Sequence, residues 1–260
     1  MIDTHTHLYL SDSYPEEGGG VCGAVERAID AGVSHLVFPN IDVASVMPML
    51  RLHDNFPEQT SVCRGLHPTE VRDNWREELR EIRELTSDAD CKAWGEIGVD
   101  LYWDESFRSK QMDAFGEQLD LAYSERLPVI IHSRNAWDET LEILQSMGGR
   151  TPGLLFHSFT SGPEDARKVI EIFPEARFAV NGVLTFKNGG EVREALKVIG
   201  KDRVMLETDS PFLAPVPKRG RTNESAYLEY IRDVAAATLS MSPEEFETVS
   251  DRNAREFFRL

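Results

Sequence analysis

The chain has few cysteines and no long apolar run. Cys22, Cys63 and Cys91 are its three cysteines, and they form no CxxC pair. We interpret them as buried thiols in a reducing compartment, because a disulfide framework needs an even set of cysteines. No stretch of about eighteen apolar residues occurs, which argues against a membrane span. The N-terminus also lacks the basic region and apolar stretch of a signal peptide, so we expect a cytoplasmic protein.

Basic residues are also scarce. The chain has 28 Lys and Arg residues against 45 Asp and Glu residues, which gives a formal charge of -17. This balance argues against a protein that grips long nucleic acid along a basic surface, because such affinity comes from many phosphate contacts. An enzyme that takes one strand end into a small pocket is compatible with it. The acidity can also serve only to keep a cytoplasmic protein soluble.

Short apolar runs alternate with amphipathic stretches from end to end, and no linker or low-complexity tract divides the chain. Alternation of strand and helix is typical of a parallel α/β fold. Eight such units predict a closed (β/α)8 TIM barrel, with an open doubly wound sheet as the alternative. We expect one domain over residues 1–260. The expected strands are 2–8, 35–39, 61–66, 91–99, 128–132, 153–157, 177–180 and 203–207.

Helix signals occur between the expected strands. The apolar residues Met112, Phe115 and Leu119 follow one another at spacings of three and four, which predicts a helix over 111–123. A glycine at position 200 indicates a helix end. The run "SPEE" begins at Ser242 and predicts a capping box with Glu245.

Two histidines stand close together in the run "DTHTHL", which begins at Asp3. His5 and His7 are two residues apart, so on a strand both side chains point the same way. Two imidazoles at this spacing can converge on one metal ion. A pair of partly buried, hydrogen-bonded histidines explains the motif equally well, and the HxH pattern alone does not decide between them.

Later strands also end in side chains of the kind that bind metals. Glu96 lies late in "KAWGEIGVD", His132 ends "PVIIHS", His157 ends "GLLFHSF", and Asp209 follows "VMLETD". In a barrel, the carboxyl ends of all strands meet at one rim, where active sites are built. Five strand ends that each supply such residues predict a metal site. The expected ligands are His5, His7, Glu96, His132, His157 and Asp209.

This set suits two ions better than one. Four neutral histidines and two carboxylates would overfill a single ion once water and substrate join. We expect Glu96 to bridge two divalent ions (Mg, Mn or Zn), with the histidines of "DTHTHL" and Asp209 on one side and the two later histidines on the other. Two ions, two carboxylates and a hydroxide leave a net charge of +1, which suits an anionic phosphodiester. Two ions about 3.5–4 Å apart can hold an attacking hydroxide and stabilise the leaving oxygen.

Further candidates are less specific. His67 ends an apolar run in "GLHP", and we interpret it as a substrate contact to a phosphate oxygen, with a structural histidine before a turn as the alternative. Glu207 lies two residues before Asp209. It could orient that residue or a water, or it could be a buried carboxylate beside a basic group.

Charged and aromatic residues near the predicted rim could contact substrate. Lys218 and Arg219 lie in a polar loop after the last strand and could bind backbone phosphates, or the loop could simply be solvated. Tyr102 and Trp103 could stack on a base. Packing beneath a loop is the slightly favoured interpretation for these two aromatic residues.

Taken in order, the motifs resemble those of a known family. The runs "DTHTHL", "GLHP", "GEIGVD", "HSRNAWDETL", "FHSFTSG", "NGVLTFKN" and "ETDSPFLAPVPKRGRTNES" resemble the TatD family of metal-dependent deoxyribonucleases, from Asp3 to about Ser225. The resemblance implies a TIM-barrel metallohydrolase that acts as a DNA nuclease, in several members as a 3′–5′ exonuclease, with Mg or Mn. Carried over by position, it implies the same six ligands. Thr69 stands where many members have a second histidine.

We therefore expect a divalent-metal-dependent deoxyribonuclease that acts on single-stranded DNA ends as an exonuclease. A metal-bound hydroxide would attack phosphorus, with Glu96 and Asp209 as the catalytic carboxylates and Asp209 taking up the proton. No membrane and no stable protein partner is expected. The alternatives are a metal-dependent ester or amide hydrolase, such as a D-aminoacyl-tRNA deacylase, and a metal-binding accessory protein without turnover.

Overall fold

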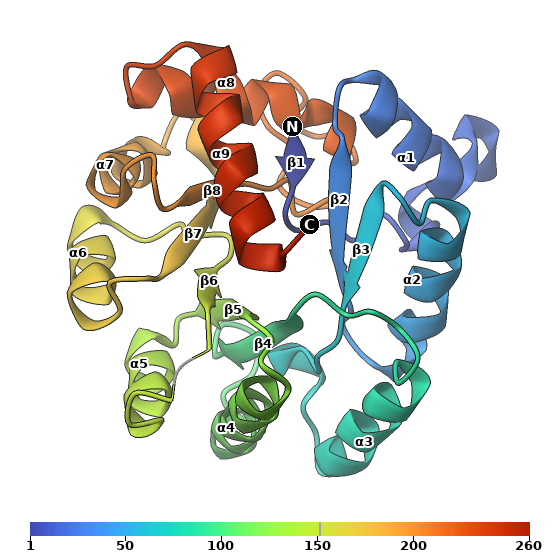
Figure 1. Ribbon diagram of the computed structural model, residues 1–260, viewed down its shortest axis with the longest axis vertical. Helices are drawn as coiled ribbons and strands as arrows, with labels where there is room; N and C mark the ends of the chain where they lie inside the picture. Colours follow the sequence, from blue (N-terminus) through green and yellow to red (C-terminus); the bar gives the residue numbers. More distant parts are fainter. Residues whose placement is uncertain (151) are drawn as a thin grey trace.

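A computed structural model describes residues 1–150 and 152–260 of the chain. Within these residues, parallel strands form a ring and helices surround it (Figure 1). Each strand except the last pairs in parallel with its successor in the chain or is bridged to it. The strands are β1 Ile2–Asp3, β2 His35–Pro39, β3 Thr60–Cys63, β4 Trp94–Asp100, β5 Val129–Arg134, β6 Leu154–Phe156, β7 Arg177–Val180 and β8 Val204–Leu206.

The ring closes through two isolated bridges. The strands form one strip of β1 to β3 and a second strip of β4 to β8. A bridge between Arg64 and Trp94 joins β3 to β4, and a bridge between Thr6 and Ser210 joins the segments that follow β1 and β8. The backbone N–H of Thr4 also donates to the carbonyl of Leu206 at 3.0 Å. The barrel prediction is therefore confirmed, and the open doubly wound sheet is excluded.

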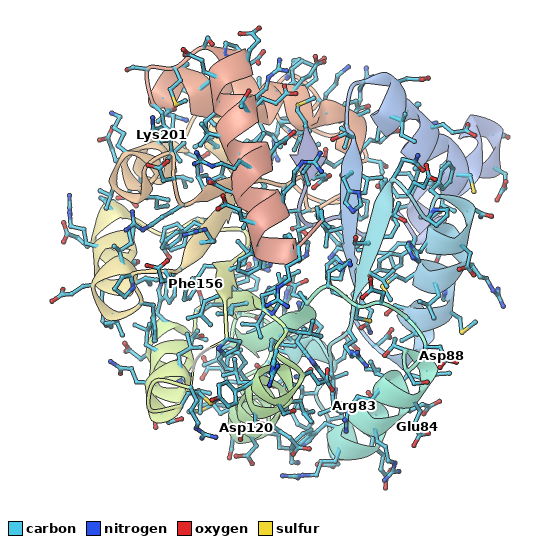
Figure 2. All side chains as sticks on the ribbon, in the orientation of Figure 1. Arg83, Glu84, Asp88, Asp120, Phe156 and Lys201 are labelled. Atoms are coloured by element: carbon cyan, nitrogen blue, oxygen red, sulfur yellow. The ribbon has the colours of Figure 1, made fainter. Side chains whose placement is uncertain are left out.

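The helices cover the outside of the ring. Their apolar faces pack on the strands, while charged side chains such as Glu84, Asp120 and Lys201 lie on the outer surface (Figure 2). In the described part of the chain, no helix is both long and apolar enough to cross a bilayer. The helices are α1 Gly20–Asp30, α2 Val43–Asn55, α3 Trp75–Leu85, α4 Arg108–Glu125, α5 Trp137–Ser146, α6 Pro163–Ile172, α7 Gly190–Ile199, α8 Leu228–Thr238 and α9 Pro243–Phe258.

Local signals in the sequence set several element ends correctly. Helix α7 ends at Ile199, directly before Gly200. Helix α9 begins with the expected capping box, in which the Ser242 side chain accepts from the backbone of Glu245. The predicted first strand is wrong in length, because β1 ends at Asp3 rather than reaching residue 8. Beyond Asp3, Thr4 bonds to β8 and Thr6 bonds to β2, so the chain follows neither neighbour as a regular strand.

An apolar layer fills the inside of the barrel near the amino ends of the strands. Each strand or the residue before it contributes one side chain to this layer, and α9 adds two more. Figure 1 shows α9 lying across this end of the ring. Helix α9 therefore closes the amino-terminal end of the barrel. The layer consists of Ile2, Val37, Cys63, Ala93, Ile130, Leu155, Ala179 and Met205, with Ala254 and Phe258 from α9.

Candidate metal centre

The opposite end of the barrel, where the strands terminate, is polar and hollow. A cavity of about 750 Å³ opens there, and its lining includes His7, Glu96, His132, His157 and Asp209. His5 lies fully buried against this group. The six residues predicted as ligands are thus brought together at one place, although they come from five separate strands or the segments that follow them.

One cluster of side-chain atoms surrounds Oε2 of Glu96. The Nε2 atoms of His5 and His7 are 3.1 Å apart, and they lie 3.1 and 3.5 Å from this oxygen. Oδ1 of Asp209 is 3.8 Å from both nitrogens. Four ligands at about 2.0–2.1 Å from a tetrahedral ion lie roughly 3.3 Å apart. The cluster therefore has the donor types and the spacing that a divalent ion requires.

A second cluster surrounds the other oxygen of Glu96. Oε1 lies 2.6 Å from Nδ1 of His132 and 2.7 Å from Nε2 of His157. Nε2 of His67 is 3.3 Å from the same oxygen. Since His67, Glu96 and His132 form one of the groups able to hold an ion, His67 lies among the candidate ligands as well as on the cavity wall. The two oxygens of Glu96 face two different clusters.

Burial and charge act against each other at this centre. Burial acts to raise the pKa of Glu96, but the surrounding imidazoles of His157, His67 and His5 hold it well below its usual range. Burial lowers the pKa of His5 to about 4. Burial also raises the pKa of Asp209 to about 7, because the nearby carboxylates add to its effect. Glu96 therefore stays ionised despite its burial, and an ionised carboxylate among imidazoles suits a bound cation.

Carboxylates lie behind two of the histidines. Nε2–H of His132 donates to Asp100 at 2.9 Å, which turns Nδ1 toward Glu96. Nδ1 of His157 lies 3.6 Å from Glu207. Carboxylates behind metal-binding imidazoles fix the ring and its tautomer. Glu207 is fully buried, and its carboxylate accepts from the backbone N–H of Ser158 and from the side chain of Asn181.

His7 is held by a tyrosine. The Tyr9 hydroxyl donates to the carbonyl of Pro39, and Nδ1 of His7 lies 2.7 Å from the same hydroxyl oxygen. A carbonyl can only accept, so the one hydroxyl proton is used there. Nδ1 of His7 must then donate to Tyr9, which leaves the lone pair of Nε2 facing Glu96 and Asp209. Tyr9 and Asp100 did not emerge from the sequence as site residues.

A glycine in "GEIGVD" explains part of this motif. Gly98 has φ +148°, and a Cβ at this position would lie 1.9 Å from the carbonyl oxygen of His132. Any side chain would therefore push β5 and the imidazole of His132 away from Glu96. The motif combines one ligand, one close backbone approach and the carboxylate of Asp100 on a single strand.

The structure places the two predicted basic substrate contacts outside the cavity lining. Nζ of Lys218 lies 5.0 Å from the ring of Tyr227 and 5.6 Å from that of Tyr230. The guanidinium of Arg219 lies 3.9 Å from the ring of Phe186. Neither side chain is among the residues that line the cavity, so their contact with phosphate stays a prediction.

The aromatic pair after β4 is exposed, so the favoured packing interpretation is wrong. Tyr102 is 51% and Trp103 is 71% exposed, and Trp103 lines the cavity. Arg134, at the end of β5, also lines the cavity and was not identified from the sequence.

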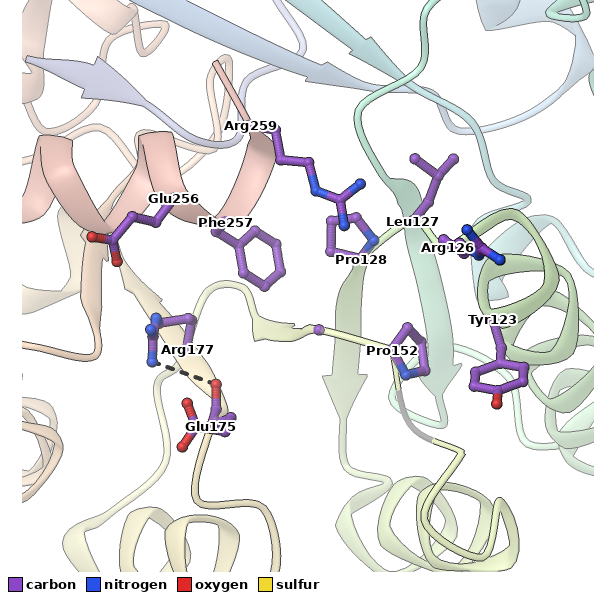
Figure 3. Close-up of a pocket in the computed structure, with 11 residues that line it drawn as sticks. Tyr123, Arg126, Leu127, Pro128, Pro152, Glu175, Arg177, Glu256, Phe257 and Arg259 are labelled. Atoms are coloured by element: carbon purple, nitrogen blue, oxygen red, sulfur yellow. Dashed lines mark hydrogen bonds between the residues drawn. The ribbon is translucent and has the colours of Figure 1, made fainter.

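A smaller cavity, of about 420 Å³, lies at the amino-terminal end of the barrel (Figure 3). It is lined by Arg126, Arg177 and Arg259 together with Glu175 and Glu256. Arg177 donates to the carbonyl of Glu175. In barrels of this kind, active sites lie at the other end.

A closed parallel barrel with histidines and carboxylates gathered at its carboxyl rim defines the class of TIM-barrel, metal-dependent hydrolases. Residues 2–259 match the family model described as TatD related DNase. The chain therefore belongs to the TatD family.

Similar proteins agree with this assignment. The chain is 32% identical over 262 residues to "Uncharacterized metal-dependent hydrolase YabD" of Bacillus subtilis, and the match covers 100% of this chain and 99% of that protein. It is 31% identical to "3'-5' ssDNA/RNA exonuclease TatD" of Erwinia billingiae, over 91% of this chain and 92% of that protein. The fold matches the crystal structure of YJJV, a TatD homolog from Escherichia coli, with a TM-score of 0.89, 24% identity, and coverage of 100% of this chain and 98% of that one.

Proposed function

We propose that this protein is a divalent-metal-dependent deoxyribonuclease that removes nucleotides from single-stranded DNA ends. The observation that carries the proposal is the position of Glu96, whose two oxygens face two clusters of ligand atoms at the floor of an open cavity. The name of the Erwinia relative, a 3'-5' ssDNA/RNA exonuclease, supports this substrate class. The acidic chain favours short single-stranded ends over long duplex.

The residues present fit two divalent ions (Mg, Mn or Zn). His5, His7 and Asp209 would hold one with Glu96, and the remaining histidines would hold the other. When bound, such ions supply charge neutralisation at a phosphodiester and a more acidic water.

The chain's own groups supply orientation and proton transfer. Asp209 faces both His5 and His7 and lines the cavity, so it can position the attacking water and accept its proton. Glu96 fixes the two clusters relative to each other. His67 lies beside Glu96 on the cavity wall, where it can contact an ion or a phosphate oxygen.

The direct test uses metal-stripped protein and a single-stranded DNA oligomer labelled at its 3′ or its 5′ end. Mg, Mn or Zn is added back, and Glu96→Ala is compared with Glu256→Ala, which removes a carboxylate at the far end of the barrel. We expect a ladder of products that needs metal and Glu96 and is unaffected at position 256. A ladder that retains the 5′ label indicates cleavage from the 3′ end, and a ladder that retains the 3′ label indicates cleavage from the 5′ end.

A failure of this test is informative. If two ions bind and no phosphodiester is cleaved with any metal, the deoxyribonuclease proposal is wrong. The same centre would then act on esters or amides, and D-aminoacyl-tRNA is the next substrate to assay.

A further inference from the structure

Three side chains form a contiguous surface at the mouth of the cavity. Tyr102 and Trp103 follow β4, and their rings meet edge to face at 4.8 Å and 88°. The guanidinium of Arg134 lies 3.8 Å from the centroid of Tyr102 and 5.3 Å from that of Trp103. Trp103 and Arg134 line the cavity that Glu96 and Asp209 also line. We call this surface, made of Tyr102, Trp103 and Arg134, the mouth platform.

Packing does not explain Trp103. The chain has four tryptophans; Trp75 and Trp94 are 2% and 0% exposed, and Trp137 is half-buried. Trp103, at 71%, leaves most of its indole in water beside a cavity. A large exposed aromatic ring at a concave site is typical of a binding surface.

Arg134 is free to bind an anion. Asp100 lies opposite Arg134 in the register of β4 and β5, but its carboxylate binds the imidazole of His132 and the backbone N–H of Tyr102 instead. In the part of the chain that the structure describes, Arg134 forms no ion pair. Its contacts with the aromatic rings hold the planar group in place and leave its N–H donors for a ligand. Phosphate oxygens match this donor geometry. The mouth platform therefore places a flat apolar surface beside a fixed cation.

We infer that the mouth platform binds one nucleotide of a single strand, with its base stacked on Trp103 and its phosphate bound by Arg134. The inference rests on the proposed nuclease function and names how its substrate is held. A base can cover an indole only when it is unpaired and unstacked, so the platform selects single-stranded ends. Phe212, 53% exposed, lines the same cavity from the loop after β8 and offers a second apolar surface to the strand.

The acidity of the chain strengthens this inference. At a formal charge of -17, many phosphate contacts are not available to provide affinity. Stacking does not depend on net charge and tolerates any sequence, because every base has a π face. A nuclease of this composition therefore needs an aromatic surface close to its centre.

The experiment measures binding separately from cleavage. Metal-loaded protein is titrated with a labelled, phosphorothioate-linked thymidine oligomer that resists hydrolysis, and with an abasic oligomer of equal length. We expect Trp103→Ala to bind the thymidine oligomer about ten-fold more weakly than the unaltered protein, and Trp103→Phe to recover most of the loss. Both proteins should bind the abasic oligomer equally. Tyr123→Ala, which removes an exposed ring at the far end of the barrel, is the matched control.

The contribution of Arg134 is measured by the salt dependence of binding. Arg134→Ala should reduce the slope of log affinity against log salt by about 0.7, the value for one lost phosphate contact on a single strand. Arg134→Lys should restore the slope, since it keeps the charge.

The possible results separate the two proposals. Equal affinity of Trp103→Ala and the unaltered protein for the thymidine oligomer overturns the mouth platform, even if DNA is cleaved. Binding that depends on Trp103 without cleavage by any metal supports the platform and overturns the nuclease. A failure of the unaltered protein to bind either oligomer contradicts both.

Discussion

The two ends of the barrel are built from the same eight strands and are opposite in character. At the amino-terminal end, one apolar side chain per strand meets Ala254 and Phe258 of α9, and the interior is sealed. At the carboxyl-terminal end, histidines and carboxylates surround a cavity of about 750 Å³. The polar side chains come from the strands themselves or from the residues that follow them in the chain. Apolar packing at the amino-terminal end thus helps to hold the strands that position the polar side chains at the carboxyl-terminal end.

The energetic terms differ in the same way. Each apolar side chain buried against α9 stabilises the fold, by roughly 25 cal/mol for every Å² removed from water. Each buried imidazole or carboxylate costs free energy unless a partner compensates it. The Glu96 carboxylate has such partners, because nitrogens of five histidines lie within 3.5 Å of its oxygens. We therefore expect changes at the polar end to affect metal binding and activity, and changes at the apolar end to affect stability.

The largest effect is expected from Glu96→Gln. This change keeps the volume of the side chain and removes the charge that both clusters share. We expect metal-dependent hydrolysis to fall at least about 1000-fold and metal binding to weaken at both clusters. Calorimetric titration with Mn and Zn, together with the oligomer assay, checks this. Full activity in the variant would show that Glu96 does not join the two clusters.

Phe258→Ala tests the apolar end. The ring is 1% exposed and belongs to the interior layer, so its removal should lower the free energy of unfolding by about 3–4 kcal/mol. Urea unfolding measures the loss, and Phe257→Ala, at a half-buried neighbour, should cost less. Metal affinity of the folded variant should not change. A variant with unaltered stability and weakened metal binding would reverse the roles assigned to the two ends.

Tyr9→Phe removes one oxygen from behind His7. Without the hydroxyl, Nδ1 of His7 loses the partner that fixes its tautomer. We expect metal affinity to fall about ten-fold, as is typical when a group behind a ligand is lost. Competition titration against a chelating dye gives the affinity, and Tyr14→Phe, a buried tyrosine that bonds to the backbone of Asn223, is the control. Equal affinities in both variants would contradict the tautomer argument.

The smallest effect is a pH dependence at the amino-terminal end. Burial lowers the pKa of His35 from 6.5 to about 4, with the charge of Arg255 acting in the same direction. As pH falls below 6.5, His35 binds a proton in the unfolded chain but stays neutral in the folded protein until about pH 4. The free energy of unfolding therefore decreases progressively from pH 6.5 to about pH 4. His35→Gln should lose less stability over this window. Urea midpoints at pH 7 and at about pH 4 compare the two, and parallel profiles would contradict the assignment.

The carboxyl-terminal end was predictable from the sequence to the level of residues. An apolar run predicts a strand, and the polar residue that follows it is expected at the carboxyl-terminal rim of the barrel. Sequence alone could therefore place Glu96, His132, His157 and Asp209 at this rim. Side chains alternate along a strand, so Glu96 and Asp100 share one face of β4, and this spacing is visible in the sequence. Burial of Cys63 and Cys91 agrees with prediction, whereas Cys22 is only half-buried.

Contacts between distant segments were not predictable in the same way. The pairing of Tyr9 with Pro39 and of Asp100 with His132 depends on the register between strands, which no local pattern encodes. Lys218 and Arg219 are close to Asp209 in sequence, yet their loop carries them onto aromatic rings outside the cavity lining. Proximity along the chain is a weak guide in loops, because a few residues suffice to reverse direction.

The location of bound metal tests the two clusters around Glu96 most directly. Crystals of the protein grown with Mn would be measured at a wavelength where Mn scatters anomalously. We expect two peaks, one beside each carboxylate oxygen of Glu96, with His5 and His7 near the first and His132 and His157 near the second. A single peak, or peaks away from Glu96, would contradict the central claim that this carboxylate joins two metal sites at the carboxyl end of the barrel.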